Sequence, residues 1–163
     1  MQLIHENYLR SGMFGLQDGL VSTTGVVVGI STGIEDKAII ILASLVAVTV
    51  EATSMAAGQY SSEKAVHQLD ITKKREDSLI IGALIMFFAY FLGGTVPIIP
   101  TLLLSQPEAK IAAIVAALIG LFIAGLVKGH LVKIKPLRSA TELLIIGGLA
   151  TSIGLIVGHF LKV

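Results

Sequence analysis

The stretch SLIIGALIMFFAYFLGGTVPIIPTLLL, residues 78–104, runs without a single charged side chain. A helix needs about 20 mostly apolar residues to cross the hydrocarbon core of a bilayer. These residues therefore predict a membrane-spanning helix. Because proline removes a backbone donor and clashes with the preceding turn, we expect a break or kink near Pro97 and Pro100.

The rest of the chain repeats this pattern of apolar runs between short polar connections. Of the 163 residues, 54% are hydrophobic and only 14% are charged, whereas soluble domains average about 25% charged residues. The longest polar stretch, residues 62–77, is too short for a separate domain and is expected to continue the second helix into the cytoplasm. We expect an all-α polytopic membrane protein whose residues 1–163 form a single domain. Its five transmembrane helices would cover residues 11–33, 38–61, 78–104, 111–129 and 141–161.

Lysine and arginine residues are divided unequally between the two sides of this arrangement. Nine of them fall on the side of the N-terminus and three on the other side. Because cytoplasmic loops are enriched in positive charge, the N-terminus is expected in the cytoplasm and the C-terminus outside. The nine are Arg10, Lys64, Lys73, Lys74, Arg75, Lys128, Lys133, Lys135 and Arg138, and the three are Lys37, Lys110 and Lys162.

The composition excludes several classes of function. There is no cysteine, so neither a disulfide framework nor a thiolate metal site can form. The net charge of +1 gives no electrostatic reason to expect nucleic-acid binding. No nucleophile–base arrangement and no phosphate-binding loop is present, so we do not expect an enzyme.

Two acidic residues, Asp18 and Glu51, lie inside apolar spans. A charge at the centre of a bilayer costs about 2.5–3.5 kcal/mol on insertion scales, so such residues usually face a protein interior or a water-filled path. At about 1.5 Å per residue, Asp18 lies roughly 10 Å and Glu51 roughly 15 Å from the cytoplasmic ends of their spans. Because the two helices run antiparallel, both carboxylates are expected at a similar level.

Further polar or small side chains share the helix faces of these two carboxylates. Met55 and Gln59 follow the acidic residue of the second span at helical spacing. Ser22, Gly25 and Gly29 follow the acidic residue of the first span in the same way. The two glycines form a GxxxG pair, which permits close approach of another helix backbone. We therefore predict a polar path lined by these side chains.

The chemistry that this path permits is binding of a divalent cation. Carboxylate oxygen is a hard ligand, whereas the thioether of Met55 is soft and favours transition metals over Mg²⁺ and Ca²⁺. The same carboxylates can carry protons, so metal arriving and protons leaving would make an antiporter. Two simpler interpretations remain open. Asp18 would be a helix N-terminal residue if the first helix begins near Leu16, and Met55 alone is more often a packing residue.

Two other classes of membrane protein are compatible with the same residues. One is a non-transporting membrane subunit with a role in assembly or regulation. The other is a carrier for another cation, such as an organic cation, because buried carboxylates also serve such substrates. The aromatic content of 6% argues against an aromatic pocket for an organic cation.

Four motifs resemble the vacuolar iron transporter family, and they occur in the family's order over nearly the whole chain. The first helix carries DGLVSTTGVVVGISTG at residues 18–33, and the second carries SMAAGQY at residues 54–60. GGTVPIIP at residues 93–100 is similar to the third helix of the family. KGHLVKIKPLRSATELLIIGGLATSIGLIVG at residues 128–158 is similar to the region of the fourth and fifth helices.

The resemblance implies a five-helix homodimer that exports Fe²⁺, and often Mn²⁺, from the cytosol in exchange for protons. It implies a pathway at the dimer interface, lined by the first helix of each protomer, with Asp18 and Met55 implicated in ion passage. Gly25 and Gly29 fit such a closely packed interface. The metal would be the transported substrate, no cofactor is expected, and the membrane would be the cell membrane of a prokaryote or a vacuole-like membrane of a eukaryote.

The chain departs from the family in two respects. Well-studied members carry a glutamate-rich cytoplasmic domain between the second and third helices, where this chain has only residues 62–77. An acidic residue is common in the family where Gln59 stands, so the cytoplasmic entrance here is less acidic. The chain therefore resembles the shorter members that lack this domain, and Mn²⁺ competes with Fe²⁺ as the expected substrate.

Overall fold

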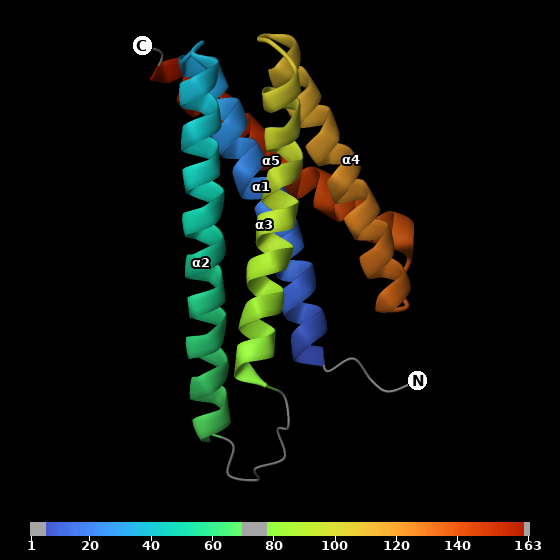
Figure 1. Ribbon diagram of the computed structural model, residues 1–163. Helices are drawn as coiled ribbons and strands as arrows, with labels where there is room; N and C mark the ends of the chain where they lie inside the picture. The colour runs from blue at the N-terminus through green and yellow to red at the C-terminus, as the bar shows by residue number, and fades with distance from the viewer. Residues whose placement is uncertain (1–5, 70–77, 162–163) are drawn as a thin grey trace.

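Five α-helices make up the computed structural model, which describes residues 6–69 and 78–161 (Figure 1). All five are long and apolar enough to cross a membrane, and the described residues contain no β-strand. The predicted all-α membrane fold with five spanning helices is therefore confirmed. The helices are α1 (Glu6–Gly33), α2 (Lys37–Leu69), α3 (Leu79–Leu103), α4 (Glu108–Leu131) and α5 (Pro136–Phe160).

The helices alternate in direction, so the bundle has two ends. We call the end where α1 begins and α2 ends the N-side, and the opposite end the C-side. Figure 1 shows the N-terminal end of α1 at the lower end of the bundle and the end of α5 at the upper end. The second helix continues past its apolar span through Leu69, as expected, while residues 70–77 lie outside the described residues.

Helix α1 is the centre of the bundle, because it packs against all four other helices. In its most apolar window 39% of the residues are buried, against 22–28% for the other four helices. Helix α3 also packs against α2 and α4, and α5 also packs against α4. Side chains placed on α1 can therefore reach partners on any other helix.

The core contains both small and large side chains, and many large apolar side chains also face outward. Buried residues of the core include Val27, Val48, Ala52 and Ala113. Exposed leucine, isoleucine, valine and phenylalanine side chains occur on all five helices. In a soluble protein such a surface would be unfavourable, but lipid tails are as apolar as these side chains. This distribution is that of an integral membrane protein.

Helix α3 is continuous from Leu79 to Leu103, so the break expected near Pro97 and Pro100 is absent. Regular hydrogen bonding resumes directly after the prolines, since Leu104 donates its N–H to the carbonyl of Pro100 at 2.9 Å. Helix α3 also packs closely against α1 before the prolines, because a Cβ at Gly93 would come within 2.6 Å of the Leu16 carbonyl oxygen. Transmembrane helices tolerate proline, because neighbouring helices and local adjustments satisfy the freed backbone groups.

Candidate functional site

The carboxylate of Glu51 lies where three helices meet. It accepts hydrogen bonds from the hydroxyl of Tyr90 on α3 and, at 3.3 Å, from the hydroxyl of Ser22 on α1. The two hydroxyls also contact each other. A carboxylate within an apolar helix is thereby oriented by two neutral donors, which is the usual way of keeping a buried acidic group hydrogen-bonded.

Asp18 lies one helical turn before Ser22 on α1, and it is partly buried. Because Ser22 donates a hydrogen bond to Glu51 and lies one turn after Asp18 on the same face of α1, Asp18 lies on the part of α1 that adjoins the Glu51 network. Because α1 begins at Glu6, Asp18 is about three turns inside the helix, and its interpretation as a helix N-terminal residue is wrong. Two neighbouring carboxylates in apolar surroundings need a compensating positive charge, which protons or a cation can supply.

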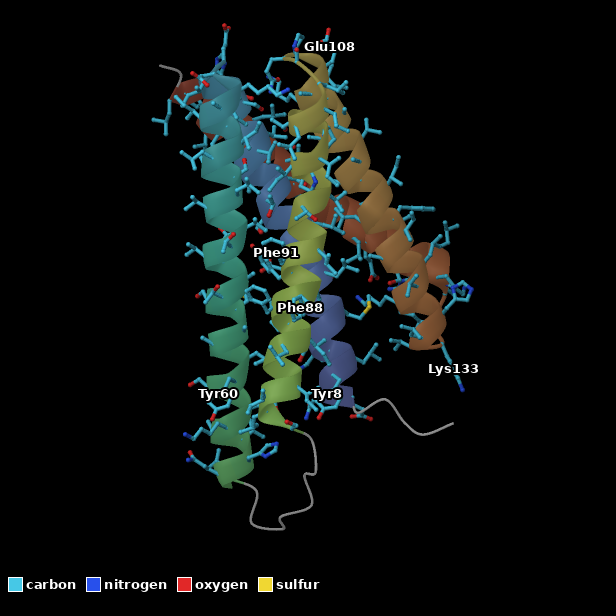
Figure 2. The ribbon with its side chains drawn as sticks, in the orientation of Figure 1. Tyr8, Tyr60, Phe88, Phe91, Glu108 and Lys133 are labelled. Carbon is cyan, nitrogen blue, oxygen red and sulfur yellow. The ribbon has the colours of Figure 1, made fainter. Side chains whose placement is uncertain are left out.

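Met55 lies one turn beyond Glu51 and packs against the core cluster that contains Tyr90 and Ala52. The aromatic rings of Phe87 and Phe91 pack against the same cluster, with their centroids 6.0 Å apart. Figure 2 shows Phe91 at the contact between α2 and α3. Met55 and the two aromatic rings thus pack against the same buried cluster, which includes the Tyr90 side chain of the hydrogen-bonded network.

Gln59 lies one further turn toward the N-side on α2. Its side-chain Nε2 is buried and has no hydrogen-bond partner among the described residues. Three residues spaced one turn apart on this face of α2 are only partly exposed: Glu51, Met55 and Gln59. Their neighbours Thr53 and Gly58 are exposed.

Gly25 and Gly29 contact α5 of the same chain. A Cβ at Gly154 would come within 2.4 Å of the Gly25 carbonyl oxygen, and one at Gly158 within 2.1 Å of the Gly29 carbonyl oxygen. The predicted close packing at this GxxxG pair is thus present, and its partner is a second GxxxG pair that the sequence interpretation did not single out.

Ser22, Gly25 and Gly29 also line an open, mostly apolar groove of about 640 Å³ between α1 and α5. The groove runs toward the C-side as far as Gly33 and Ile34. It connects the serine that contacts Glu51 with the far end of the bundle.

Tyr90 is the site residue that the sequence interpretation missed. It is only 1% exposed, and its hydroxyl joins the contacts of Glu51 and Ser22. One signal was available, since Tyr90 is the only tyrosine within residues 78–104. A tyrosine hydroxyl in a membrane span needs a polar partner, and the nearby helices offered two.

One chain offers few ligands for a metal ion. Within residues 6–69 and 78–161 no three histidine, cysteine or acidic side chains gather where they could hold a metal. Asp18 and Glu51 supply carboxylates, Met55 supplies a thioether and Ser22 a hydroxyl, all from α1 and α2. A complete coordination shell would need further groups from water or from another copy of the chain.

Comparison with known proteins adds an independent line of evidence. The sequence model of the VIT family matches residues 9–77 and 65–159. Vacuolar iron transporter homolog 1 of Arabidopsis thaliana is 28% identical over 158 residues, which cover 90% of this chain and 79% of the relative. Vacuolar iron transporter homolog 2 of Oryza sativa subsp. japonica is 26% identical over 160 residues, covering 88% and 85%.

Vacuolar iron transporter 1 of Arabidopsis thaliana shows higher identity over a shorter region. It is 37% identical over 86 residues, which cover 52% of this chain and only 34% of that relative. This chain thus spans about a third of that longer protein but about four fifths of the homologs. The family match extends through all five helices, and the chain belongs to the VIT family.

Proposed function

We propose that this chain transports a divalent transition metal, Fe²⁺ or Mn²⁺, out of the cytosol in exchange for protons. The observation that carries the proposal is the Glu51 carboxylate, held inside the membrane span by Ser22 and Tyr90 with Asp18 nearby. Membership of the VIT family and the names of the relatives, vacuolar iron transporters, support iron as a substrate.

The ligand chemistry supports a transition metal over Mg²⁺ or Ca²⁺. Asp18 and Glu51 offer hard oxygen ligands, whereas Met55 offers a soft sulfur ligand. A divalent cation would compensate the charge of both carboxylates. When the cation leaves, protons can take its place, so the same two groups can couple metal release to proton uptake.

A homodimer would complete this site. In a two-fold symmetric dimer the ligands of both protomers gather about the axis, which doubles their number. The groove between α1 and α5 lies next to Ser22 and is a suitable place for a second copy of α1.

The distribution of charge supports a cytosolic N-side. Among the described residues, the N-side carries six lysine and arginine residues and the C-side two. The remaining four of the predicted count, Lys73, Lys74, Arg75 and Lys162, lie outside the described residues.

Metal flux into proteoliposomes tests the proposal. Vesicles would hold a metal-quenched dye, and Fe²⁺ under reducing conditions or Mn²⁺ would be added with and without a pH gradient. We expect quenching that depends on the gradient in the wild type and is lost in Asp18→Asn and Glu51→Gln. Glu142→Gln, which changes an exposed carboxylate on α5, is the matched control and should keep full flux.

Absence of flux for both metals, from wild-type protein shown to be folded and inserted, would overturn the proposal. A non-transporting membrane subunit would then be the better explanation. Flux of an organic cation that depends on Glu51 would instead indicate a carrier for a different substrate.

A further inference from the structure

A polar cavity lies at the C-side, where two connections of the bundle meet. Its volume is about 630 Å³. The wall is formed by the last turn of α1, the start of α2, the connection between α3 and α4, and the first turn of α4. Figure 2 shows this end of the bundle, with Glu108 labelled at the start of α4. The polar lining residues include Thr32, Glu35, Lys37, Ser105, Gln106 and Lys110.

Two lysines line this cavity, and both bond only to neutral oxygens. Lys110 is partly buried, and its Nζ donates to the hydroxyl oxygen of Thr32 at 3.4 Å. Nζ of Lys37 donates to the carbonyl of Leu102 at 3.0 Å. Within residues 6–69 and 78–161, neither lysine forms an ion pair with a carboxylate. Because an ammonium group has three N–H donors, each lysine can donate to a further acceptor in the cavity.

The acidic side chains at this end do not neutralise the lysines. Among the described residues, Glu35 is the one acid of the wall, and it is exposed. The neighbouring Asp36 caps α2, because its Oδ1 accepts from the N–H groups of Ala38 and Ile39 at 2.8 and 3.2 Å. Glu108 is exposed and lies outside the lining. The wall therefore has two positive charges against one negative charge.

Gln106 adds a side-chain amide to the same wall. Its Nε2 and its Oε1 are both buried, and neither has a hydrogen-bond partner among the described residues. A buried polar group without a partner is unfavourable, and most such groups in proteins are satisfied. Turning the amide toward a group bound in the cavity would supply the missing partner. Its N–H groups would then join the two ammonium groups as donors.

These groups decide the class of ligand that fits the cavity. Ammonium groups donate hydrogen bonds and cannot accept them, and their charge repels a metal ion. A phosphate group offers several charged oxygens, and lysine is a common phosphate ligand in proteins. The hydroxyls of Ser31 and Thr32 already donate to the carbonyl of Val28, at 3.2 and 2.7 Å, so their oxygens are left as acceptors. They can receive the O–H of a phosphate that carries a proton.

We propose that this C-side cavity binds a phosphate group, held by the ammonium groups of Lys37 and Lys110 and by the side-chain amide of Gln106. The group can belong to inorganic phosphate or to a phospholipid headgroup at the membrane surface, because both present the same charged oxygens. The cavity has no lining residue in common with the groove between α1 and α5 and does not include Glu51. Binding of phosphate therefore does not rest on the proposed function.

Calorimetric titration of inorganic phosphate into the purified full-length protein in detergent tests the site. We expect saturable binding by the wild type, about tenfold weaker binding by Lys110→Gln and by Gln106→Leu, and none by Lys37→Gln/Lys110→Gln. Gln106→Leu separates binding from folding. Removing a buried amide that has no partner should keep or raise thermal stability while it weakens phosphate binding. Phosphate binding that is unchanged in the double variant would overturn the proposal.

The matched control is Lys133→Gln, which also removes one positive charge. Lys133 is exposed, and Figure 2 shows it at the opposite end of the bundle from Glu108. Its substitution should leave the affinity for phosphate at the wild-type value. Equal weakening by Lys133→Gln and Lys110→Gln would indicate a general effect of net charge and would also overturn the proposal.

A titration with phosphatidylglycerol distinguishes the two sources of the phosphate group. Native mass spectrometry would count the lipid molecules bound to the wild type and to Lys37→Gln/Lys110→Gln. Binding of inorganic phosphate that needs both lysines, with equal lipid counts, identifies free phosphate as the ligand. No binding of inorganic phosphate, together with one fewer lipid on the double variant, identifies a headgroup. If neither ligand depends on the two lysines, the proposal is overturned.

Discussion

If Glu51 exchanges metal and protons as proposed, its carboxylate must stay oriented inside a membrane helix and still be able to change partners. The hydroxyls of Ser22 and Tyr90 meet both needs, because neutral donors orient a carboxylate without neutralising its charge. A lysine or arginine in the same place would compete with an arriving metal ion.

Tyr90→Phe should weaken this network while leaving the shape of the core unchanged. A hydrogen bond to a charged group contributes about 1.5–3 kcal/mol, so we expect a free energy of unfolding lower by about that amount. Metal uptake should also slow, because Glu51 loses one of the groups that orient it. Thermal unfolding in detergent and dye-quenching flux measure the two effects.

The control for this prediction is Tyr60→Phe on α2. Tyr60 is 38% exposed and its ring lies 5.9 Å from Nζ of Lys64, away from the network. Its substitution should leave both measurements near the wild-type values. Equal effects of the two substitutions would contradict the role assigned to the Tyr90 hydroxyl.

Met55→Leu distinguishes a sulfur ligand from a packing residue. Leucine keeps the bulk, and such a swap usually costs less than about 1.5 kcal/mol of stability. If the thioether binds the metal, the ratio of transition-metal to Mg²⁺ binding should fall. Met86→Leu is the control, since Met86 is 2% exposed in the core of α3. Unchanged selectivity in Met55→Leu would leave Met55 as a packing residue alone.

At the scale of elements, the contact between α1 and α5 depends on glycine. Gly154→Ala or Gly158→Ala would place a methyl group within 2.4 Å or 2.1 Å of a backbone oxygen of α1. Backbone cannot move aside as a flexible side chain can, so we expect each change to destabilise the fold by about 1–3 kcal/mol. Unfolding of the purified variants in detergent measures the loss.

Gly148 gives the matched control on the same helix. A Cβ at Gly148 would have no neighbouring atom within 4 Å. Gly148→Ala should therefore leave stability unchanged or raise it by up to about 1 kcal/mol, because alanine favours a helix more than glycine does. Similar losses in all three variants would indicate a general effect of helix composition and not a close contact.

The helices were predictable because membrane spans are defined by local apolar runs. The ends of the helices were harder to predict. The first turns of α1 and the last turns of α2 are polar and lie outside the apolar runs. The similar depth predicted for Asp18 and Glu51 came from counting residues along antiparallel helices. The hydroxyl of Tyr90, in contrast, meets a carboxylate 39 residues away, and only the packing of three helices decides that contact.

The same limit applies to the glycines. The GxxxG pair of α1 indicated a close contact, but a local pattern does not identify its partner, which proved to be Gly154 and Gly158 of α5. Helix α3 shows the converse, because two prolines indicated a break or kink and the helix continues from Leu79 to Leu103. Local chemistry thus predicts the elements, and long-range packing decides how they meet.

At the scale of the whole molecule, one chain does not supply enough ligands to surround a metal ion. The described residues offer two carboxylates at the site, no larger cluster of ligands, and an open apolar groove beside them. A second copy of α1 in that groove would cover its apolar surface and bring in a second set of ligands. A homodimer would therefore both cover the apolar groove and supply the missing ligands.

Cysteine cross-linking tests this arrangement, and the chain is suited to it because it contains no cysteine. Single substitutions Val21→Cys, Val26→Cys and Ile30→Cys follow the groove along α1. Residues near a two-fold axis face their own copies, and a disulfide forms only when the Cα atoms approach to about 4.4–6.8 Å. In native membranes under mild oxidation, at least one of the three should yield a covalent dimer.

Ile119→Cys on α4 supplies the control, since Ile119 is 55% exposed and lies outside the groove. It should remain monomeric on a denaturing gel under the same conditions. Cross-linking at Ile119 but at none of the α1 positions would place the second copy on another face. Asp18 and Glu51 would then have to bind the metal with ligands from one chain and water alone, and a two-fold axis beside Ser22 would be excluded.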